Sequence, residues 1–160
     1  MTALTFGHVG VGVADIDAAC DWYSTVFGFK VLRPPFETAA TGGPSGAQAH
    51  DVLGRDFRRM RQAFLVSGDG VGIELFQLID PPHQRREPSL EYWRSGVFHF
   101  CLTAPDIEAV TARVVAHGGV QRSQIWPERP PNEERKMVYL EDPWGTIIEL
   151  HTHRCEAMYA

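Results

Sequence analysis

The stretch Phe98–Leu102 (FHFCL), followed by Asp106–Ala109 (DIEA), decides the fold of this chain because it has an earlier counterpart. Near the N-terminus, Gly7–Val11 (GHVGV) is followed by Asp15–Ala18 (DIDA). The two histidines are 91 residues apart (99 − 8), and so are the two leading aspartates (106 − 15). An internal repeat of this kind indicates one structural unit per copy. We therefore predict two copies of one module.

Each copy later carries one glutamate inside an apolar run, in Ile73–Leu75 (IEL) and Ile148–Leu150 (IEL). These glutamates are only 75 residues apart (149 − 74), so the first copy holds 16 extra residues (91 − 75) before its glutamate. The two copies together supply two histidines and two glutamates: His8, His99, Glu74 and Glu149.

The composition is that of an ordinary globular protein. The chain has 160 residues, of which 44% are hydrophobic and 22% charged. Its net charge of −5 argues against binding to nucleic acid or an anionic membrane. No apolar run approaches the roughly 20 residues that span a bilayer. Three cysteines without paired spacing and an N-terminus unlike a signal peptide lead us to expect a cytoplasmic protein with reduced thiols.

Hydrophobic periodicity predicts the order β-α-β-β-β in each copy, and so an α+β fold. Asp15 and Asp106 are predicted helix N-caps, and Gly28 a helix C-cap. One module alone exposes a whole sheet face, so we expect the two modules to pair their sheets, within one chain or between two chains. The expected division is a first module at 1–82, a connector at 83–96, a second module at 97–153 and a C-terminal tail at 154–160.

The extra residues of the first copy are expected at about 34–61. Pro34 and Pro35 are predicted to stop the preceding strand, and the Gly-rich segment 38–46 to form a surface loop. The segment 49–61 mixes apolar and basic residues and is predicted to form a short amphipathic helix. Long insertions of this kind are functional lids or solvated excursions, and both interpretations remain open.

The repeated histidines and glutamates predict a metal site. All four lie mid-strand among apolar neighbours. An isolated ionised carboxylate is costly to bury, and its occurrence in both copies indicates one shared partner. Imidazole suits Zn, Ni, Fe and Co, and carboxylate oxygen extends the range to Mn. We therefore predict one divalent metal ion whose ligands are His8, Glu74, His99 and Glu149.

Some further residues are weaker candidates. His151 shares a strand face with Glu149, but we expect it at a solvated strand end. Cys101 shares the face of His99 and is expected to fill space in the core. Cationic groups that could hold an anionic substrate, each expected to be exposed, are Arg33, Arg58, Arg59, Arg61 and Lys136.

A set of motifs spans most of the chain outside the insertion: His8–Val11 (HVGV), Asp15-Ile16, Trp22–Phe29 (WYSTVFGF), Ile73–Leu75 (IEL), His99, Asp106–Glu108 (DIE) and Asp142–Leu150 (DPWGTIIEL). In these motifs the chain resembles the vicinal oxygen chelate superfamily, which includes glyoxalase I, methylmalonyl-CoA epimerase, extradiol dioxygenases and bleomycin- or fosfomycin-resistance proteins. The resemblance implies two βαβββ modules that pair their sheets around a metal site, a small-molecule substrate and a homodimer.

The order His, Glu, His, Glu is similar to glyoxalase I. That resemblance implies an octahedral ion held by the four residues, with two positions left for water or substrate. It also implies that the ion stabilises an enediolate while a ligand carboxylate, Glu74 or Glu149, moves the proton. The expected activity is that of a metal-dependent lyase or isomerase acting next to a carbonyl.

Three alternatives remain open. Residues 11–13 (VGV) replace the arginine that holds glutathione in glyoxalase I, and the opening HVGV is more similar to methylmalonyl-CoA epimerase. An additional glutamate serves as the base in that family, and Glu37 lies in about that region. Extradiol dioxygenases need iron on two histidines and one glutamate, which His8, His99 and Glu149 could supply. A resistance-type protein would bind a drug without catalysis, generally without metal ligands.

Overall fold

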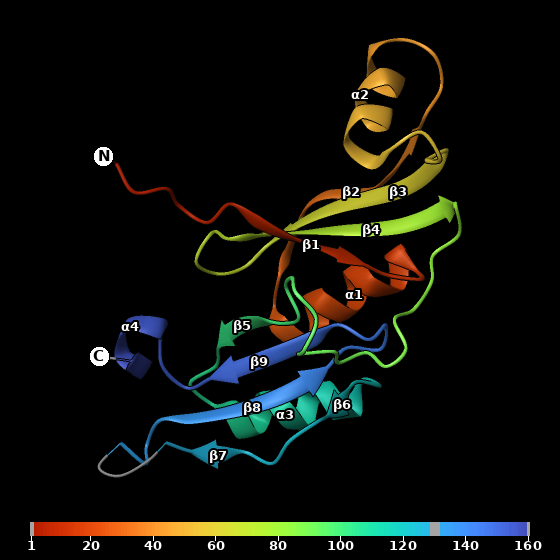
Figure 1. Ribbon diagram of the computed structural model, residues 1–160. Helices are drawn as coiled ribbons and strands as arrows, with labels where there is room; N and C mark the ends of the chain where they lie inside the picture. The colour runs from red at the N-terminus through yellow and green to blue at the C-terminus, as the bar shows by residue number, and fades with distance from the viewer. Residues whose placement is uncertain (1, 129–131, 160) are drawn as a thin grey trace. The chain divides into compact units, whose positions relative to one another are not determined.

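The computed structural model describes residues 2–128 and 132–159, which hold two β-sheets and four α-helices. The chain divides into two compact units, the first up to Gln84 and the second from Arg85 onward (Figure 1). Each unit contains one sheet, so the α+β class predicted from the repeat is confirmed. Of the helices in the described residues, none combines the length and apolar character that crossing a bilayer requires.

The first unit is a four-stranded sheet with two helices. Its strand order is β1-β4-β3-β2. The elements are β1 (His8–Gly12), α1 (Ile16–Phe27), β2 (Lys30–Ala39), α2 (Pro44–Leu53), β3 (Arg59–Val66) and β4 (Gly72–Asp80).

The second unit has the same plan with a broken edge strand. Its order is β5-β9-β8-β6, and β7 also pairs with β8. In both units the first strand runs parallel to the last, and the remaining pairs are antiparallel. The elements are β5 (Phe100–Thr103), α3 (Ile107–Ala116), β6 (Val120–Gln121), β7 (Trp126–Pro127), β8 (Lys136–Glu141), β9 (Ile147–His151) and α4 (Cys155–Tyr159).

The repeat extends to the pairing register of the strands. Glu74 of β4 lies opposite Gly10, and Glu149 of β9 lies opposite Cys101. In each case the partner is the second residue after the repeated histidine. The neighbour on the other side is Phe64 in the first unit and Tyr139 in the second. The duplication therefore places histidine and glutamate at the same relative positions in both sheets.

The opposite face of each sheet is the hydrophobic core. Successive strand residues point to opposite faces, so the residues flanking each glutamate point away from it. Ile73 and Leu75 are 2% and 0% exposed, and Ile148 and Leu150 are both 0% exposed. Buried side chains of α1 and α3 supply the helical part of this core: Ile16, Ala19, Tyr23 and Val26 from α1, and Ile107, Thr111 and Val114 from α3.

Helices α1 and α3 begin as the sequence predicts. The Asp15 carboxylate accepts hydrogen bonds from two amides of the first turn of α1, both at 3.1 Å. Asp106 accepts one from Ala109 of α3 at 3.0 Å. Gly28, with a φ of 72°, ends α1 in the left-handed conformation, as predicted.

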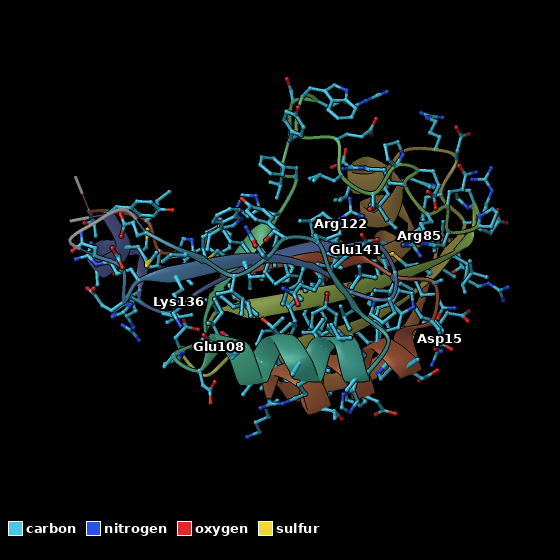
Figure 2. All side chains as sticks on the ribbon, turned by 90° about the horizontal axis from the view of Figure 1, so that it is seen from below. Asp15, Arg85, Glu108, Arg122, Lys136 and Glu141 are labelled. Atoms are coloured by element: carbon cyan, nitrogen blue, oxygen red, sulfur yellow. The ribbon has the colours of Figure 1, made fainter. Side chains whose placement is uncertain are left out.

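One ion pair between helix and sheet also occurs in both units. Arg61 of β3 binds Asp17 of α1 through two hydrogen bonds of 2.6 and 3.1 Å. Lys136 of β8 binds Glu108 of α3, and Figure 2 labels both residues. The two carboxylates are 91 residues apart (108 − 17) and the two cations 75 (136 − 61), the same offsets that the repeat gives.

The prediction that Pro34 and Pro35 end the second strand is wrong. They lie inside β2, which continues to Ala39. This strand is at the edge of its sheet, and the register shifts between Val31 and Phe36. An edge strand tolerates proline because one of its sides has no partner strand that needs the missing N–H. The expected loop at 38–46 is correspondingly shorter.

The inserted helix also differs from its prediction. It is α2, which begins at Pro44 and ends at Leu53, where the sequence indicated a helix at 49–61. A buried cluster of Ala49, Phe57 and Met60 forms next to it, with Phe76 and Leu78 packed against the cluster. These two β4 residues alternate with Leu75 and so share the face of Glu74. Figure 1 shows α1 and α2 on opposite sides of the sheet.

The connector and the C-terminal tail both contain local structure. In the connector, the Arg94 N–H donates a hydrogen bond of 3.0 Å to the Glu91 carbonyl, which closes one turn. Arg85 of the connector forms an ion pair of 2.7 Å with the buried Glu141, to which Arg122 of the second unit also binds at 2.9 Å (Figure 2). The expected C-terminal tail contains the short helix α4, which buries Met158.

Candidate metal and proton-transfer site

In the first unit, the repeated histidine and glutamate are in contact. His8 Nε2 lies 3.2 Å from Glu74 Oε2, with side-chain exposures of 57% and 13%. The other oxygen, Oε1, accepts a hydrogen bond of 3.3 Å from the Gln62 amide. Thr38 in turn donates a 2.6 Å hydrogen bond to the Gln62 carbonyl. Oε1 of Glu74 is thus bound by a chain of two neutral side chains, Gln62 and Thr38.

The second unit repeats the contact with a different surrounding. His99 Nε2 lies 3.2 Å from Glu149 Oε2, with side-chain exposures of 25% and 9%. The other oxygen, Oε1, lies 3.2 Å from His151 Nε2. Each oxygen of Glu149 therefore faces its own histidine.

Two more side chains approach Glu149 from neighbouring strands. Tyr139 of β8 is hydrogen-bonded to it, and partial burial together with that negative charge raises the pKa of the Tyr139 hydroxyl to about 12. Cys101 of β5 is exposed as a residue, yet partial burial and the Glu149 charge raise the pKa of its thiol to about 12. Both groups therefore keep their protons at neutral pH and can donate to the carboxylate.

The donor atoms fit a divalent ion. Ligand atoms about 2.0–2.2 Å from an ion are roughly 2.8–3.6 Å apart when adjacent. The N···O contacts in both units fall in this range, at 3.2 Å. In the part of the chain that the structure describes, neither Glu74 nor Glu149 has an arginine or lysine partner. The negative charge at both places is therefore available to a cation.

His99 has one unusual atom. Its Nδ1 is buried and finds no hydrogen-bond partner among residues 2–128 and 132–159. Leaving a buried polar atom unpaired costs about 1–3 kcal/mol. The ring packs edge-to-face against Tyr139, with ring centroids 5.3 Å apart. The packing therefore holds the ring with Nε2 toward Glu149, even though Nδ1 has no partner there.

Two expectations from the sequence are wrong at this place. His151 is not at a solvated strand end, because it is only 5% exposed and its ring contacts Tyr159 of α4. Cys101 does not fill the core, because it is exposed on the Glu149 side of the sheet. The spacing of His151 from Glu149 already placed both on one face, but the covering helix α4 had no clear sequence signal.

Most of the candidate anion-binding cations have other partners. Arg61 and Lys136 bind the helix carboxylates described above. Arg58 donates to backbone carbonyls of Arg55 and Phe57, and the Arg33 guanidinium lies 3.6 Å above the Phe36 ring.

Glu37 does not lie with the other candidates. In β2 it is adjacent to Thr38, which points to the Glu74 side through its bond to Gln62. By alternation Glu37 points to the opposite face, the one that α1 covers. That placement disfavours Glu37 as a base acting beside Glu74.

Comparison with known proteins agrees with the fold. A curated 2-epi-5-epi-valiolone epimerase from an Actinomyces species is 28% identical over 151 residues, covering 92% of this chain and 79% of that protein. A glyoxalase family protein from Bacillus cereus has a TM-score of 0.76 at 19% identity, with 94% and 95% of the two chains covered.

A variant of the fosfomycin resistance protein FosX from Listeria monocytogenes, solved with Mn(II) and 1S,2S-dihydroxypropylphosphonic acid, has a TM-score of 0.56 at 16% identity and covers 99% and 100% of the chains. The sequence model of one superfamily matches residues 5–150, nearly the whole chain. The chain belongs to the glyoxalase/bleomycin resistance protein/dioxygenase superfamily.

Proposed function

We propose that this protein is a divalent-metal-dependent isomerase that removes and returns a proton next to the carbonyl of a small hydroxylated ketone. The observation that carries the proposal is the duplicated His–Glu contact, at the same register and the same 3.2 Å in both units. Without a shared role, there is no physical reason for two partly buried carboxylates to keep the same imidazole partner.

In this proposal His8, Glu74, His99 and Glu149 hold one ion, two ligands from each unit. Zn, Ni, Co, Mn and Fe all suit imidazole and carboxylate donors. The Mn(II) bound to the FosX variant shows that this fold can hold such an ion. When bound, the ion would stabilise negative charge on a substrate oxygen as the neighbouring C–H proton leaves.

Glu149 is proposed as the residue that takes and returns the proton. Its carboxylate is surrounded by groups that carry exchangeable protons, namely His151, Tyr139 and Cys101. Glu74 differs because an amide N–H of Gln62 occupies its second oxygen. A carboxylate fixed in that way is suited to a constant ligand, whereas Glu149 can pass a proton on to its neighbours.

The substrate class comes from the epimerase relative. Its name denotes inversion of configuration in a ketone, and proton removal beside a ketone followed by return from the other face accomplishes such an inversion. The identity of 28% supports the reaction class more than the particular substrate.

Solvent deuterium exchange tests the proposal. The Mn(II)-loaded protein is incubated in deuterated buffer with 2-epi-5-epi-valiolone, and with dihydroxyacetone as a small open-chain ketone, while NMR follows the protons beside the carbonyl. We expect exchange into the cyclic ketone, and its loss in the metal-stripped protein and in Glu149→Gln. Absence of exchange into both ketones would overturn the proposed reaction.

A further inference from the structure

The two units differ at three positions around the glutamate that the repeat places in each of them. Strand pairing places Gly10, Phe64 and Phe76 around Glu74. The corresponding positions around Glu149 hold three polar residues, listed in the same order: Cys101, Tyr139 and His151. Two of these three, the cysteine and the histidine, are residue types that bind soft divalent ions.

These two residues and Glu149 form a compact donor group. One ligand atom each from Cys101, Glu149 and His151 lies within 4.8 Å of the others. The His151 Nε2 to Glu149 Oε1 distance of 3.2 Å is that of adjacent ligands on one ion. Sulfur binds zinc at about 2.3 Å, so the exposed Cys101 side chain has to move by only about 1 Å to complete the group.

The donor group and the His99 contact use different oxygens of Glu149. Glu149 uses Oε2 toward His99 and Oε1 toward His151. A carboxylate can bridge two ions about 3.5–4 Å apart through its two oxygens, as in two-metal sites. Glu149 and His151 are 7% and 5% exposed, while Cys101 is exposed and offers a route of entry.

We infer that Cys101, Glu149 and His151 form a second metal site, in the second unit only, which takes a thiophilic divalent ion such as Zn²⁺ or Co²⁺. Binding breaks the S–H bond of Cys101 and forms a sulfur–metal bond, and the proton passes to solvent. The first unit has no equivalent because Gly10 and Phe76 supply no ligand atoms.

The site has a consequence that rests on the proposed function. An ion on Oε1 of Glu149 occupies the oxygen that otherwise exchanges protons with its neighbours. The second ion should therefore inhibit proton transfer. We expect excess zinc to lower the activity of the wild-type protein and to have little effect on that of Cys101→Ser.

Cobalt titration of the full-length, reduced, metal-stripped protein tests the second site without any activity measurement. A thiolate ligand gives Co²⁺ a charge-transfer absorption in the near ultraviolet, which a site of imidazole and carboxylate lacks. We expect this band in the wild-type protein at up to one ion per chain. Cys101→Ser should abolish the band and lower the affinity for this ion by more than about tenfold.

Two further variants complete the test. His151→Phe installs the residue of the first unit and should weaken the band, whereas Cys155→Ser removes another exposed thiol and should leave it unchanged. His8→Ala removes a proposed ligand of the first ion but none of the second, so it should leave the band unchanged. This variant therefore separates the second site from the proposed function. Absence of the band in wild type, or its persistence in Cys101→Ser, would overturn the second site.

Discussion

The sheets of the two units are alike on one face and differ on the other. On the core face, Leu75 and Leu150 are both fully buried and occupy equivalent positions of the repeat. In front, apolar residues and a fixed amide surround Glu74, whereas histidine, tyrosine and cysteine surround Glu149. A duplicated fold can thus keep its core and its His–Glu pair while the residues beside the pair diverge in chemistry.

The difference supports the distinct roles proposed for two carboxylates that the sequence presents as equals. Glu74 and Glu149 occupy the same IEL motif and contact a histidine at the same distance. Their second oxygens differ, facing Gln62 in one unit and His151 in the other.

The largest expected effect is on the proposed proton transfer. Glu149→Gln should lower the rate of solvent deuterium exchange by about 10²–10⁴-fold, because it removes the base. Glu74→Gln keeps an oxygen ligand and should lower the rate less, by about 10–100-fold, because the bound ion is positioned less well. Both rates are measured at saturating Mn(II). Equal losses in the two variants would contradict the assignment of the base.

The next prediction concerns the core face, which is alike in the two units. Leu75→Ala and Leu150→Ala each leave a cavity against a helix and should each lower the free energy of unfolding by about 2–5 kcal/mol. Chemical denaturation followed by circular dichroism gives both values. A cost below about 1 kcal/mol in one unit would show that the two cores are not equivalent.

A smaller effect concerns the fixed amide. Gln62 of the first unit corresponds to Met137 in the second, as their partners Phe76 and His151 occupy equivalent positions. Gln62→Met should weaken Mn(II) binding by about 10-fold or more, because Glu74 loses the group that orients it. Titration with manganese measures the affinity.

The control for that variant is Thr38→Val. It removes the hydroxyl that bonds the Gln62 carbonyl but leaves the amide in place. Its effect on manganese affinity should be smaller than that of Gln62→Met. The reverse order would mean that Gln62 does not act through Glu74.

The smallest effect is on the duplicated ion pair. The Arg61 guanidinium holds the pKa of Asp17 below its ordinary value of 3.8. Since the folded pKa is the lower one, the stabilisation is complete above pH 3.8 and is lost as the pH falls through the folded value. Asp17 is 63% exposed at its side chain, so the contribution is below about 1 kcal/mol.

The measurement is the unfolding free energy of wild type and Asp17→Asn at pH 6 and at pH 3. The two proteins should differ slightly at pH 6, and the difference should shrink at pH 3. Glu108→Gln should behave in the same way, because Lys136 lowers the pKa of Glu108 in the second unit. A difference that grows toward low pH would contradict the assignment.

The sequence predicts the fold well because the fold depends on repeated, local signals. The 91-residue offset, the aspartate caps and the alternation of apolar residues are all properties of short segments. The contacts of His8 with Glu74 and of His99 with Glu149 follow from the same repeat, and the structure brings each pair together.

The remaining features could not be predicted for physical reasons. The course of β2 through Pro34 depends on its edge position, which only the assembled sheet reveals. The burial of His151 depends on α4, a five-residue helix that gains its stability from packing and not from its own sequence. The fixed amide of Gln62 comes from a neighbouring strand and belongs to no repeated motif.

We propose that one ion takes ligands from both units, and manganese binding to two single variants is a direct test. Carboxylate and imidazole donors suit Mn(II), whereas thiolate does not, so the second site does not interfere. Free Mn(II) is counted by electron paramagnetic resonance during titration of wild type, His8→Ala and His99→Ala, with His153→Ala as a control.

We expect tight binding in wild type and in the control, and a loss of about tenfold or more in both His8→Ala and His99→Ala. Binding that survives in His8→Ala but not in His99→Ala would show that the second unit holds the ion alone, and would contradict the account.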